Sequence, residues 1–258
     1  MNILGIIPSR MASSRFPGKP MHKIMGVPMI GHCYLRSKLC NHLDELYVAT
    51  CDKEIHDYII DDLQGKSVIT SLDHERAAER CAEALIKIEK KENKTFSIII
   101  MIQGDEPLII PNLISKLIYP YKSSNNFSCV NLMNELPNFD EASNKNNVKV
   151  VVNDENRAIY FSREPIPSKS KFNKNIQYKK QLGLMSFTRD SLLFFINNKP
   201  SVLEIIESVD LNRMIEYRGE ILMVECDFQG VAVDNPEDIF LAELQMRKDK
   251  IFLKGYTK

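Results

Sequence analysis

The sequence has no excess of charge of either sign and no long apolar run. Its 258 residues include 34 lysines and arginines against 34 aspartates and glutamates, so the formal net charge is zero. Proteins that bind nucleic acid over a broad surface are usually basic overall, and this balance argues against that class. No apolar stretch approaches the ~18 residues that a membrane-spanning helix needs. We therefore expect neither nucleic acid nor a membrane as a partner.

Paired cysteines and an N-terminal targeting pattern are also missing. None of the six cysteines forms a C-x-x-C pair, and disulfides are rare in cytosolic proteins, so we expect reduced, mostly buried thiols. Residues 1–8 have no basic stretch ahead of their apolar residues, and they are typical of a first strand rather than of a signal peptide. These features favour a cytoplasmic protein.

Short β-branched runs alternate with helical patterns in the first half of the chain. The expected strands are residues 3–7, 46–50, 67–70 and 97–102. The expected helices are residues 29–40, 54–63 and 75–89, with a further helix that starts at Pro111. This alternation is the signature of βαβ units on a parallel sheet.

The second half of the chain has strands clustered ahead of its helices. The expected strands are residues 127–133, 148–153, 158–162, 182–187 and 221–226. The expected helices are residues 189–197, residues 202–216 and a last one that Asn235 caps and that runs to about residue 247. A polar stretch at 167–180 is typical of an exposed loop. We therefore predict one α/β domain over 1–258, with a mixed, mostly parallel central sheet and a strand-rich antiparallel insertion at about 127–187.

A basic loop follows the first expected strand. Arg10, Arg15 and Lys19 lie within ten residues of one another, at the point where α/β sheets place a ligand crevice. Guanidinium groups match phosphate oxygens with two parallel hydrogen bonds, and an ammonium adds a point charge. The loop therefore predicts a triphosphate site, with a solvated basic loop as the alternative. It is not a Walker A loop, because Pro20 stands where that motif requires Ser or Thr.

Two acidic segments also follow expected strands. Asp105 lies in the segment 103–107 directly after an apolar strand, and Asp234 lies between a strand and a helix. Mg²⁺ prefers carboxylate oxygens and bridges to phosphates, so the segment 103–107 is a candidate for a magnesium site, whereas the segment with Asp234 is a weak signal alone. The alternatives are an acidic turn ahead of the helix at Pro111 and ordinary helix capping at Asp234.

Four ordered motifs carry a resemblance to a known family. The segment S-R-M-A-S-S-R-F-P-G-K-P at 9–20 matches the family pattern A-R-x-x-S-[ST]-R-[LF]-P-G-K-P, and Q-G-D-E-P at 103–107 is unchanged. V-K-V-V at 148–151 with A-I-Y-F-S-R-E-P-I-P at 158–167, and V-A-V-D-N-P-E-D at 231–238, match two further patterns. The chain resembles the CMP-Kdo synthetases, the cytidylyltransferases that activate 3-deoxy-manno-octulosonate (Kdo), over nearly its whole length.

The resemblance implies a glycosyltransferase-A-like sheet with helices on both faces. It also implies a Mg²⁺-dependent reaction in which the anomeric hydroxyl of a 2-keto-3-deoxy sugar acid attacks CTP and releases pyrophosphate, and a homodimer. By the same carry-over, a first group of residues holds CTP: Arg10, Ser14, Arg15, Lys19 and Gln103. Asp105 and Asp234 would bind Mg²⁺. A second group would face the sugar acid: Arg163, Gln181, Met185, Glu204, Glu207 and Arg213.

The departures from the family patterns are concentrated. The pattern H-x-S-G-T-[ED]-R reads H-E-R-A-A-E-R at 74–80. Gln181 replaces a histidine, Met185 a tyrosine and Leu211 a glutamine. A substrate hydroxyl that faced Met185 or Leu211 would lose its partner, so we expect an acceptor other than unmodified Kdo. Two other interpretations remain: a nucleotidyltransferase for another sugar, and a non-catalytic relative that binds nucleotide.

Overall fold

The computed structural model of the chain describes residues 1–13, 15–123, 127–171, 174–228 and 230–256. The chain divides into two compact units. The first unit holds residues 1–115 together with the C-terminal segment 229–258, and the second unit holds residues 116–228. The four strands of the expected βαβ alternation lie in the first unit, and the expected strand-rich insertion at 127–187 lies within the second.

The first unit has a parallel sheet in the order β6-β1-β4-β5. Its strands are β1 (Ile3–Ser9), β4 (Glu45–Thr50), β5 (Ser67–Ile69) and β6 (Ile98–Met101). All residues of β1 and β6 are buried, as expected for strands that are covered on both faces. The predicted βαβ pattern is confirmed for this unit.

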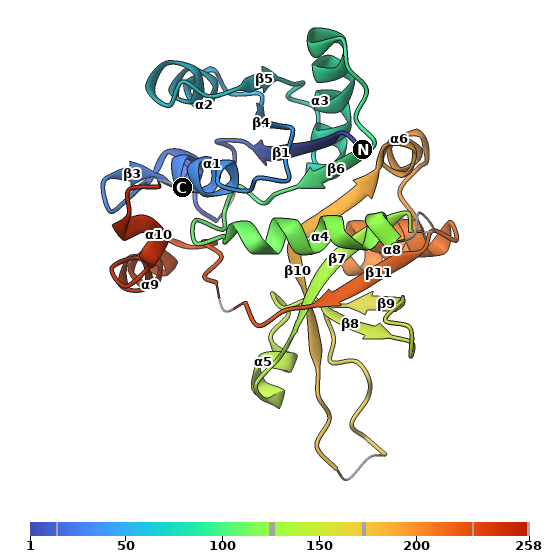
Figure 1. Cartoon of the computed structure of the whole chain (residues 1–258). Coiled ribbons are helices and arrows are strands. Elements are labelled where there is room, and N and C mark those ends of the chain that lie inside the picture. Colours follow the sequence, from blue (N-terminus) through green and yellow to red (C-terminus); the bar gives the residue numbers. More distant parts are fainter. Residues whose placement is uncertain (14, 124–126, 172–173, 229, 257–258) are drawn as a thin grey trace. The chain divides into compact units, whose positions relative to one another are not determined.

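The helices between these strands cover both faces of the sheet (Figure 1). They are α1 (Met29–Lys38), α2 (Lys53–Asp57) with its π-helical continuation η2 (Tyr58–Asp62), and α3 (Ala77–Glu92). Because parallel crossovers are right-handed, α1 and α2 on the way out to β5 lie on one face, and α3 on the way back to β6 lies on the other. From β1 the chain adds β4 and β5 on one side, and it then returns to add β6 on the other side of β1, so the order of strand addition reverses between β1 and β6. This is the topological switch point where open α/β sheets bind ligands.

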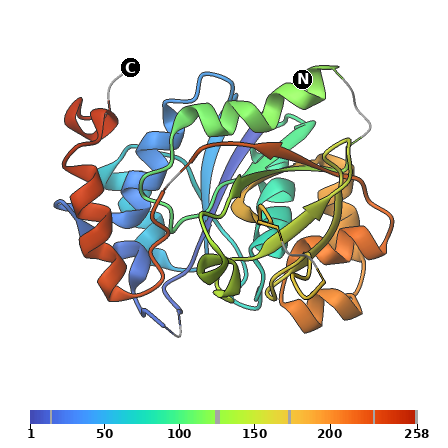
Figure 2. The ribbon, with the colours of Figure 1, turned by 90° about the horizontal axis from the view of Figure 1, so that it is seen from below.

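The C-terminal segment returns to the first unit as α9 (Pro236–Met246) and α10 (Lys250–Leu253). Figure 2 shows these two helices, in red, beside the blue α1. Apolar side chains from α9 share a buried cluster with residues from the basic loop and from the segment after β6: Phe16, Ile24, Met29, Leu108, Val233, Ile239, Ala242 and Met246. Helix α9 thus packs with the basic loop and both acidic segments around one core.

Two short elements complete the first unit. The 3₁₀ turn η1 (Lys19–Met21) follows the basic loop, and β2 (Lys23–Ile24) pairs with β3 (Val27–Pro28) in a small hairpin ahead of α1. Gly18 has φ +73°, a conformation that favours glycine over side chains with a Cβ atom. This turn leads directly into η1, which begins with Lys19.

The second unit has a mixed set of strands. They are β7 (Cys129–Glu135), β8 (Lys149–Val152), β9 (Ala158–Ser162), β10 (Lys179–Thr188) and β11 (Ile221–Glu225). β11 runs parallel to β7, whereas β10 pairs with β7, β8 with β10 and β9 with β8 in antiparallel fashion. The β10 register shifts between Gln181 and Met185, and the buried amide of Asn131 donates to the Leu182 and Leu184 carbonyls at this irregularity, at 2.8 and 2.9 Å.

The helices of the second unit are short. They are α5 (Phe139–Ser143), α6 (Arg189–Asn197), α7 (Val202–Glu207) and α8 (Asp210–Glu216), while α4 (Pro111–Ser123) spans the boundary between the units. The prediction of one helix over 202–216 is wrong, because the chain breaks at Ser208, which adopts a left-handed φ of 52°. The guanidinium of Arg163 then donates to the Glu207 and Ser208 carbonyls, at 2.7 and 3.1 Å. Such capping satisfies carbonyls that a helix end leaves without intrahelical partners.

The cysteines and the hydrophobicity of the helices agree with the composition. None of the six cysteines, all of which lie in described residues, takes part in a disulfide, and Cys51 is the one that is half-buried rather than buried. Within the described part of the chain, no helix combines the length and the apolar character that crossing a membrane requires.

Candidate active site

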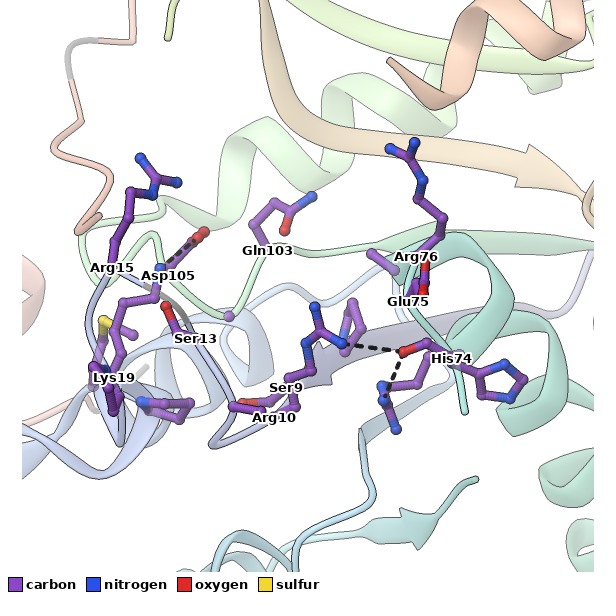
Figure 3. A pocket seen from close by; sticks show the side chains of 18 residues that line it. Ser9, Arg10, Ser13, Arg15, Lys19, His74, Glu75, Arg76, Gln103 and Asp105 are labelled. Carbon is purple, nitrogen blue, oxygen red and sulfur yellow. Dashed lines mark hydrogen bonds and ion pairs between the residues drawn. The ribbon is translucent and has the colours of Figure 1, made fainter. Parts of the chain in front are cut away.

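A cavity of about 840 Å³ opens at the switch point of the first unit, a size in the range of small-molecule sites. It is lined by the end of β1, the basic loop, the start of α3 and the segment after β6. In Figure 3, Lys19 and Asp105 meet at one side, His74, Glu75 and Arg76 lie at the opposite side, and Gln103 lies between them. The cavity is thus elongated, with an acidic and basic pair at one end.

Lys19 joins the two acidic segments. Its ammonium lies 3.0 Å from the Asp105 carboxylate and 3.7 Å from that of Asp234, and it donates to the Val233 carbonyl at 2.7 Å. The Lys19 side chain is 12% exposed, and those of Asp105 and Asp234 are 30% and 32% exposed. Two carboxylates far apart in the sequence therefore converge on one cation at the edge of the cavity.

The side chain of Asp234 does not cap α9, because neighbouring residues do so. The Asp238 carboxylate accepts from the backbone N–H groups of Asp234 and Asn235, at 2.9 and 2.8 Å, and Asn235 and Asp238 form a capping box. The Asp234 carboxylate accepts instead from the Arg15 guanidinium at 2.9 Å. Asn235 and Asp238 thus cap the helix, and the Asp234 carboxylate is left for contacts with other segments.

The segment after β6 approaches β1 closely. A Cβ atom on Gly104 would lie 3.0 Å from the Pro8 carbonyl oxygen, a tight contact with backbone, so the close approach favours glycine. The Val233 N–H donates to the Asp105 carbonyl at 2.9 Å. The two acidic segments are therefore joined directly through their backbones as well as through Lys19.

The opposite end of the cavity is held by the residues ahead of α3. The Arg10 and Arg80 guanidinium groups donate to the His74 carbonyl, at 3.3 and 3.4 Å, while the His74 ring pairs with Glu83 at 2.5 Å. Burial would raise the pKa of Glu83, but hydrogen bonds from Lys87, the Ser71 N–H and His74 lower that pKa to about 2. Sequence reasoning did not identify Glu83, since its role depends on contacts that no motif records.

Two carboxylates that share a cation make a donor set that fits Mg²⁺. This ion takes one or two protein carboxylates and completes its shell with water and substrate phosphates. No cluster of three or more His, Cys, Asp or Glu side chains that could hold a metal occurs in the described residues, so a closed protein cage is not present there. The Lys19 ammonium contacts both carboxylates and offsets their negative charge in this structure.

The structure therefore brings together Arg15, Lys19, Asp105 and Asp234, with Arg10 and Gln103 along the same cavity. Ser14, which the sequence also assigns to the nucleotide, lies outside the described residues. Arg76 and Ala77, two of the departures from the family pattern, line the cavity as well.

The second unit places two predicted acceptor residues in its interior. The carboxylate of Glu204 accepts from Nε and Nη2 of Arg213, at 2.5 and 2.6 Å, and these side chains are 0% and 2% exposed. Nη1 of Arg213 donates to the Phe195 and Asn198 carbonyls. Both charges are thus satisfied within the unit, and this geometry does not favour their predicted contact with a sugar acid.

Glu207 and Arg163 are likewise tied to the chain around them. The Glu207 carboxylate accepts from the Tyr160 and Ser162 hydroxyls and from the Arg163 N–H, at 2.7 to 2.8 Å. Burial would raise the pKa of Glu207, but these hydrogen bonds lower it. Arg163 also donates to the Lys145 carbonyl at 2.9 Å. Both residues are half-buried, and their substrate contacts remain predictions.

The structure gives no support to the expectation of an acceptor other than unmodified Kdo. That expectation requires substrate hydroxyls to face Met185 and Leu211, but these side chains are only 4% and 1% exposed. Gln181 is half-buried in β10. The substitutions at Met185 and Leu211 are therefore changes in a packed interior, where a methionine and a leucine are ordinary.

Comparison with known proteins agrees with the cavity. Residues 4–222 match the family model of cytidylyltransferases. The 3-deoxy-manno-octulosonate cytidylyltransferase of Fusobacterium nucleatum is 38% identical over 239 residues, which cover 93% of this chain and 94% of that protein. A solved structure of CMP:2-keto-3-deoxy-manno-octonic acid synthetase in complex with CTP superimposes with a TM-score of 0.89 at 31% identity, covering 96% of this chain and 99% of that one.

The chain belongs to the cytidylyltransferase family, among the 3-deoxy-manno-octulosonate cytidylyltransferases. A glucose-1-phosphate thymidylyltransferase from Bacillus anthracis, at a TM-score of 0.69 and 14% identity over 96% of each chain, shares the fold alone. Together these similarities confirm the expected fold class, a mixed, mostly parallel central sheet with helices and a small antiparallel sheet.

Proposed function

We propose that this protein transfers CMP from CTP to the anomeric hydroxyl of Kdo and releases pyrophosphate. The observation that carries the proposal is the convergence of Lys19, Asp105 and Asp234 at a switch-point cavity of nucleotide size. The relatives named for Kdo cytidylyl transfer support both substrates. The residues of the cavity account for the binding of CTP, one of the two substrates.

The cations of the cavity bind and orient the triphosphate. Arg10, Arg15 and Lys19 line the cavity from one loop, and two guanidinium groups can each donate parallel hydrogen bonds to phosphate oxygens. Gln103 lies between the two ends of the cavity, which supports a contact with the nucleoside. Holding two anionic reactants in line and neutralising their charge accounts for much of the catalysis of phosphoryl-type transfer.

The proposal includes Mg²⁺ at Asp105 and Asp234. When bound there, the ion would polarise the α-phosphate and offset the charge that develops on the leaving pyrophosphate. Lys19, which contacts both carboxylates in this structure, is then placed to turn its ammonium toward phosphate oxygens. The backbone bond between Val233 and Asp105 fixes the spacing of the two ligand-bearing segments.

The proposal also extends to the setting of the enzyme. The absence of disulfides among the six cysteines supports the cytoplasm as its location.

Exposed apolar side chains on α7, at Val202, Ile205 and Ile206, are of the kind that interfaces cover, which supports a homodimer. Light scattering at assay concentration tests the dimer, and a monomer would contradict it. A product of this kind serves the synthesis of cell-surface polysaccharide such as lipopolysaccharide.

Pyrophosphate release tests the activity. Each of CTP, UTP, GTP and ATP is offered with Kdo and with amino-, deoxy- and nine-carbon relatives of Kdo, with and without Mg²⁺. We expect release with CTP and Kdo in the presence of Mg²⁺. Preference for another nucleotide would favour a transferase for a different sugar, and binding of CTP without release from any pair would favour a non-catalytic relative.

A further inference from the structure

Among the polar side chains that α1 buries, two lie one turn apart. His32 and Arg36 are both 0% exposed, and their spacing of four residues places them on one face of the helix. Neither belongs to the cavity lining. A buried charge is expensive unless it is paired and hydrogen-bonded, so the partners of Arg36 indicate what it holds.

The guanidinium of Arg36 binds two segments that are far apart in the sequence. It donates to the Ile109 and Leu108 carbonyls, at 2.6 and 3.2 Å, and to both oxygens of Asp249, at 2.6 and 3.2 Å. Burial would raise the pKa of Asp249, but the bonds from Arg36 and from the Phe252 N–H lower it. The pair is therefore ionised and bidentate.

These two segments carry the two carboxylates of the cavity. Leu108 and Ile109 follow Asp105 by three and four residues, and Asp249 follows the helix α9 whose first turn comes directly after Asp234. Between Arg36 and the carboxylates, Leu108, Val233 and the buried side chains of α9 share one core cluster. A shift at Arg36 would therefore be transmitted through packed atoms to both ligand-bearing segments.

His32 fastens the same C-terminal segment at a second point. One ring nitrogen pairs with the Tyr256 hydroxyl and the other with the Ile24 carbonyl, and burial lowers the pKa of this histidine. A neutral ring can donate from one nitrogen and accept at the other, which both contacts allow. Residues 249–256 are thus held against α1 by two independent contacts.

Stability alone is a weak reason for a buried ion pair, because well-packed apolar residues often do as well. We propose that Arg36, together with Asp249, is a positioning residue that sets the spacing of Asp105 and Asp234 and thereby the affinity of the site for the metal–nucleotide complex. This inference rests on the proposed function for the identity of that ligand.

Mn²⁺ binding provides a test that does not depend on turnover. Mn²⁺ is titrated by electron paramagnetic resonance into the full-length protein with a non-hydrolysable CTP analogue, and binding of the analogue alone is measured in EDTA. In Arg36→Lys, a point charge cannot reproduce the planar fork that reaches two carbonyls and a carboxylate. We expect Mn²⁺ affinity to fall about 10- to 100-fold, as for outer-shell residues of other metal sites, with little change in metal-free binding.

Two further variants keep the result interpretable. Asp249→Asn removes the charge but keeps the size of the side chain, and it should weaken Mn²⁺ binding in the same direction, so it decides the matter if Arg36→Lys fails to fold. Arg213→Lys breaks the bidentate pair with Glu204 in the second unit, which is buried on both sides. It should lower the melting temperature as Arg36→Lys does, but leave Mn²⁺ affinity unchanged.

The outcomes separate this inference from the proposed function. Wild-type Mn²⁺ affinity in Arg36→Lys and Asp249→Asn, or an equal loss in Arg213→Lys, would overturn the positioning role while the proposed function stands. If the wild-type protein itself shows no binding of Mn²⁺ with the CTP analogue, the metal part of the proposed function fails, and the inference fails with it.

Discussion

Both units join an arginine to a carboxylate. Arg15 contacts Asp234, 219 residues away, beside the cavity of the first unit, and Arg213 contacts Glu204, nine residues away, in the second. The side chains of the first pair are 52% and 32% exposed, and those of the second are 2% and 0% exposed. The first pair can exchange its partners for a ligand, whereas the second has no contact with solvent to exchange. An arginine and a carboxylate therefore form a partly exposed pair beside the cavity in one unit and a fully buried pair in the other.

The same contrast applies to the cations around these pairs. Lys19 contacts two carboxylates that could bind a metal instead. The guanidinium of Arg163 donates to three backbone carbonyls. Carbonyls at a helix end are fixed by the fold and leave no room for exchange. Motif matching treats all of these residues alike, and the number and kind of partners distinguish them.

The largest effect should come from breaking the buried pair of the second unit. Arg213→Met leaves the Glu204 carboxylate buried without its partner, which costs about 3–5 kcal/mol of folding free energy. Urea unfolding measures this loss. The double variant Arg213→Met with Glu204→Leu removes both charges and should recover much of it. A stable Arg213→Met protein with a raised KM for Kdo would instead place Arg213 at the substrate, and the contrast between the units would fail.

The carboxylates of the first unit should show the opposite pattern, loss of rate with little loss of stability. Asp105→Asn and Asp234→Asn keep the size and most hydrogen bonds of the side chain but remove the charge that a metal requires. We expect kcat to fall by about a hundredfold or more at saturating Mg²⁺, which corresponds to about 3 kcal/mol of transition-state stabilisation. Unchanged unfolding curves serve as the control. Near-full turnover in both variants would contradict the assignment.

Much of this site could be predicted because its residues follow strand ends in fixed motifs. Residues 158–162 and 189–197 form the strand β9 and the helix α6 with the predicted bounds, since propensity and caps agree there. The resemblance to the family motifs assigned Arg15 to the triphosphate and Asp234 to the metal, and the two side chains lie 2.9 Å apart. Local pattern and tertiary structure point to the same answer in these segments.

The remainder depends on contacts that the sequence does not record. The break at Ser208 leaves backbone carbonyls that Arg163 satisfies, and no local pattern in 202–216 marks it. The burial of Glu204 and Arg213 follows from the packing of α7 against α8. Arg36 was not identified at all, because its partners are main-chain carbonyls and a carboxylate 213 residues away. Partners of this kind appear only when the chain is folded.

A moderate effect is expected at the exposed member of the comparison. Arg15 is half exposed and contacts Asp234 through one nitrogen, so its other donors can face phosphate. Arg15→Ala should weaken CTP binding about tenfold, the value of one charge-assisted contact. Arg15→Lys should recover little of this loss, because an ammonium cannot form the bidentate contact. Isothermal titration with CTP checks both variants, and wild-type affinity in Arg15→Ala would remove Arg15 from the phosphate site.

The smallest effect tests whether the first unit also contains a charged side chain that contributes to stability but not to binding. Glu83 of α3 holds His74 and the Ser71 N–H much as Glu207 holds the Arg163 segment of the second unit, and its pKa is lowered to about 2 by these bonds and by Lys87 against the effect of burial. A carboxyl group with a lowered folded-state pKa stabilises the fold above its unfolded pKa of about 4.3, and loses that contribution as the pH falls toward 2. Because the side chain is 24% exposed, solvent screening should reduce the contribution to about 1 kcal/mol.

Urea unfolding of the wild type and of Glu83→Gln is measured from pH 7 to pH 2. The free energies of unfolding of the two proteins should differ by a constant amount above about pH 5, and this difference should close as the pH falls to about 2. A difference that persists at the lowest pH would assign the effect of the substitution to packing, and a loss of CTP binding at pH 7 would show that this carboxylate supports the cavity beyond its own contacts.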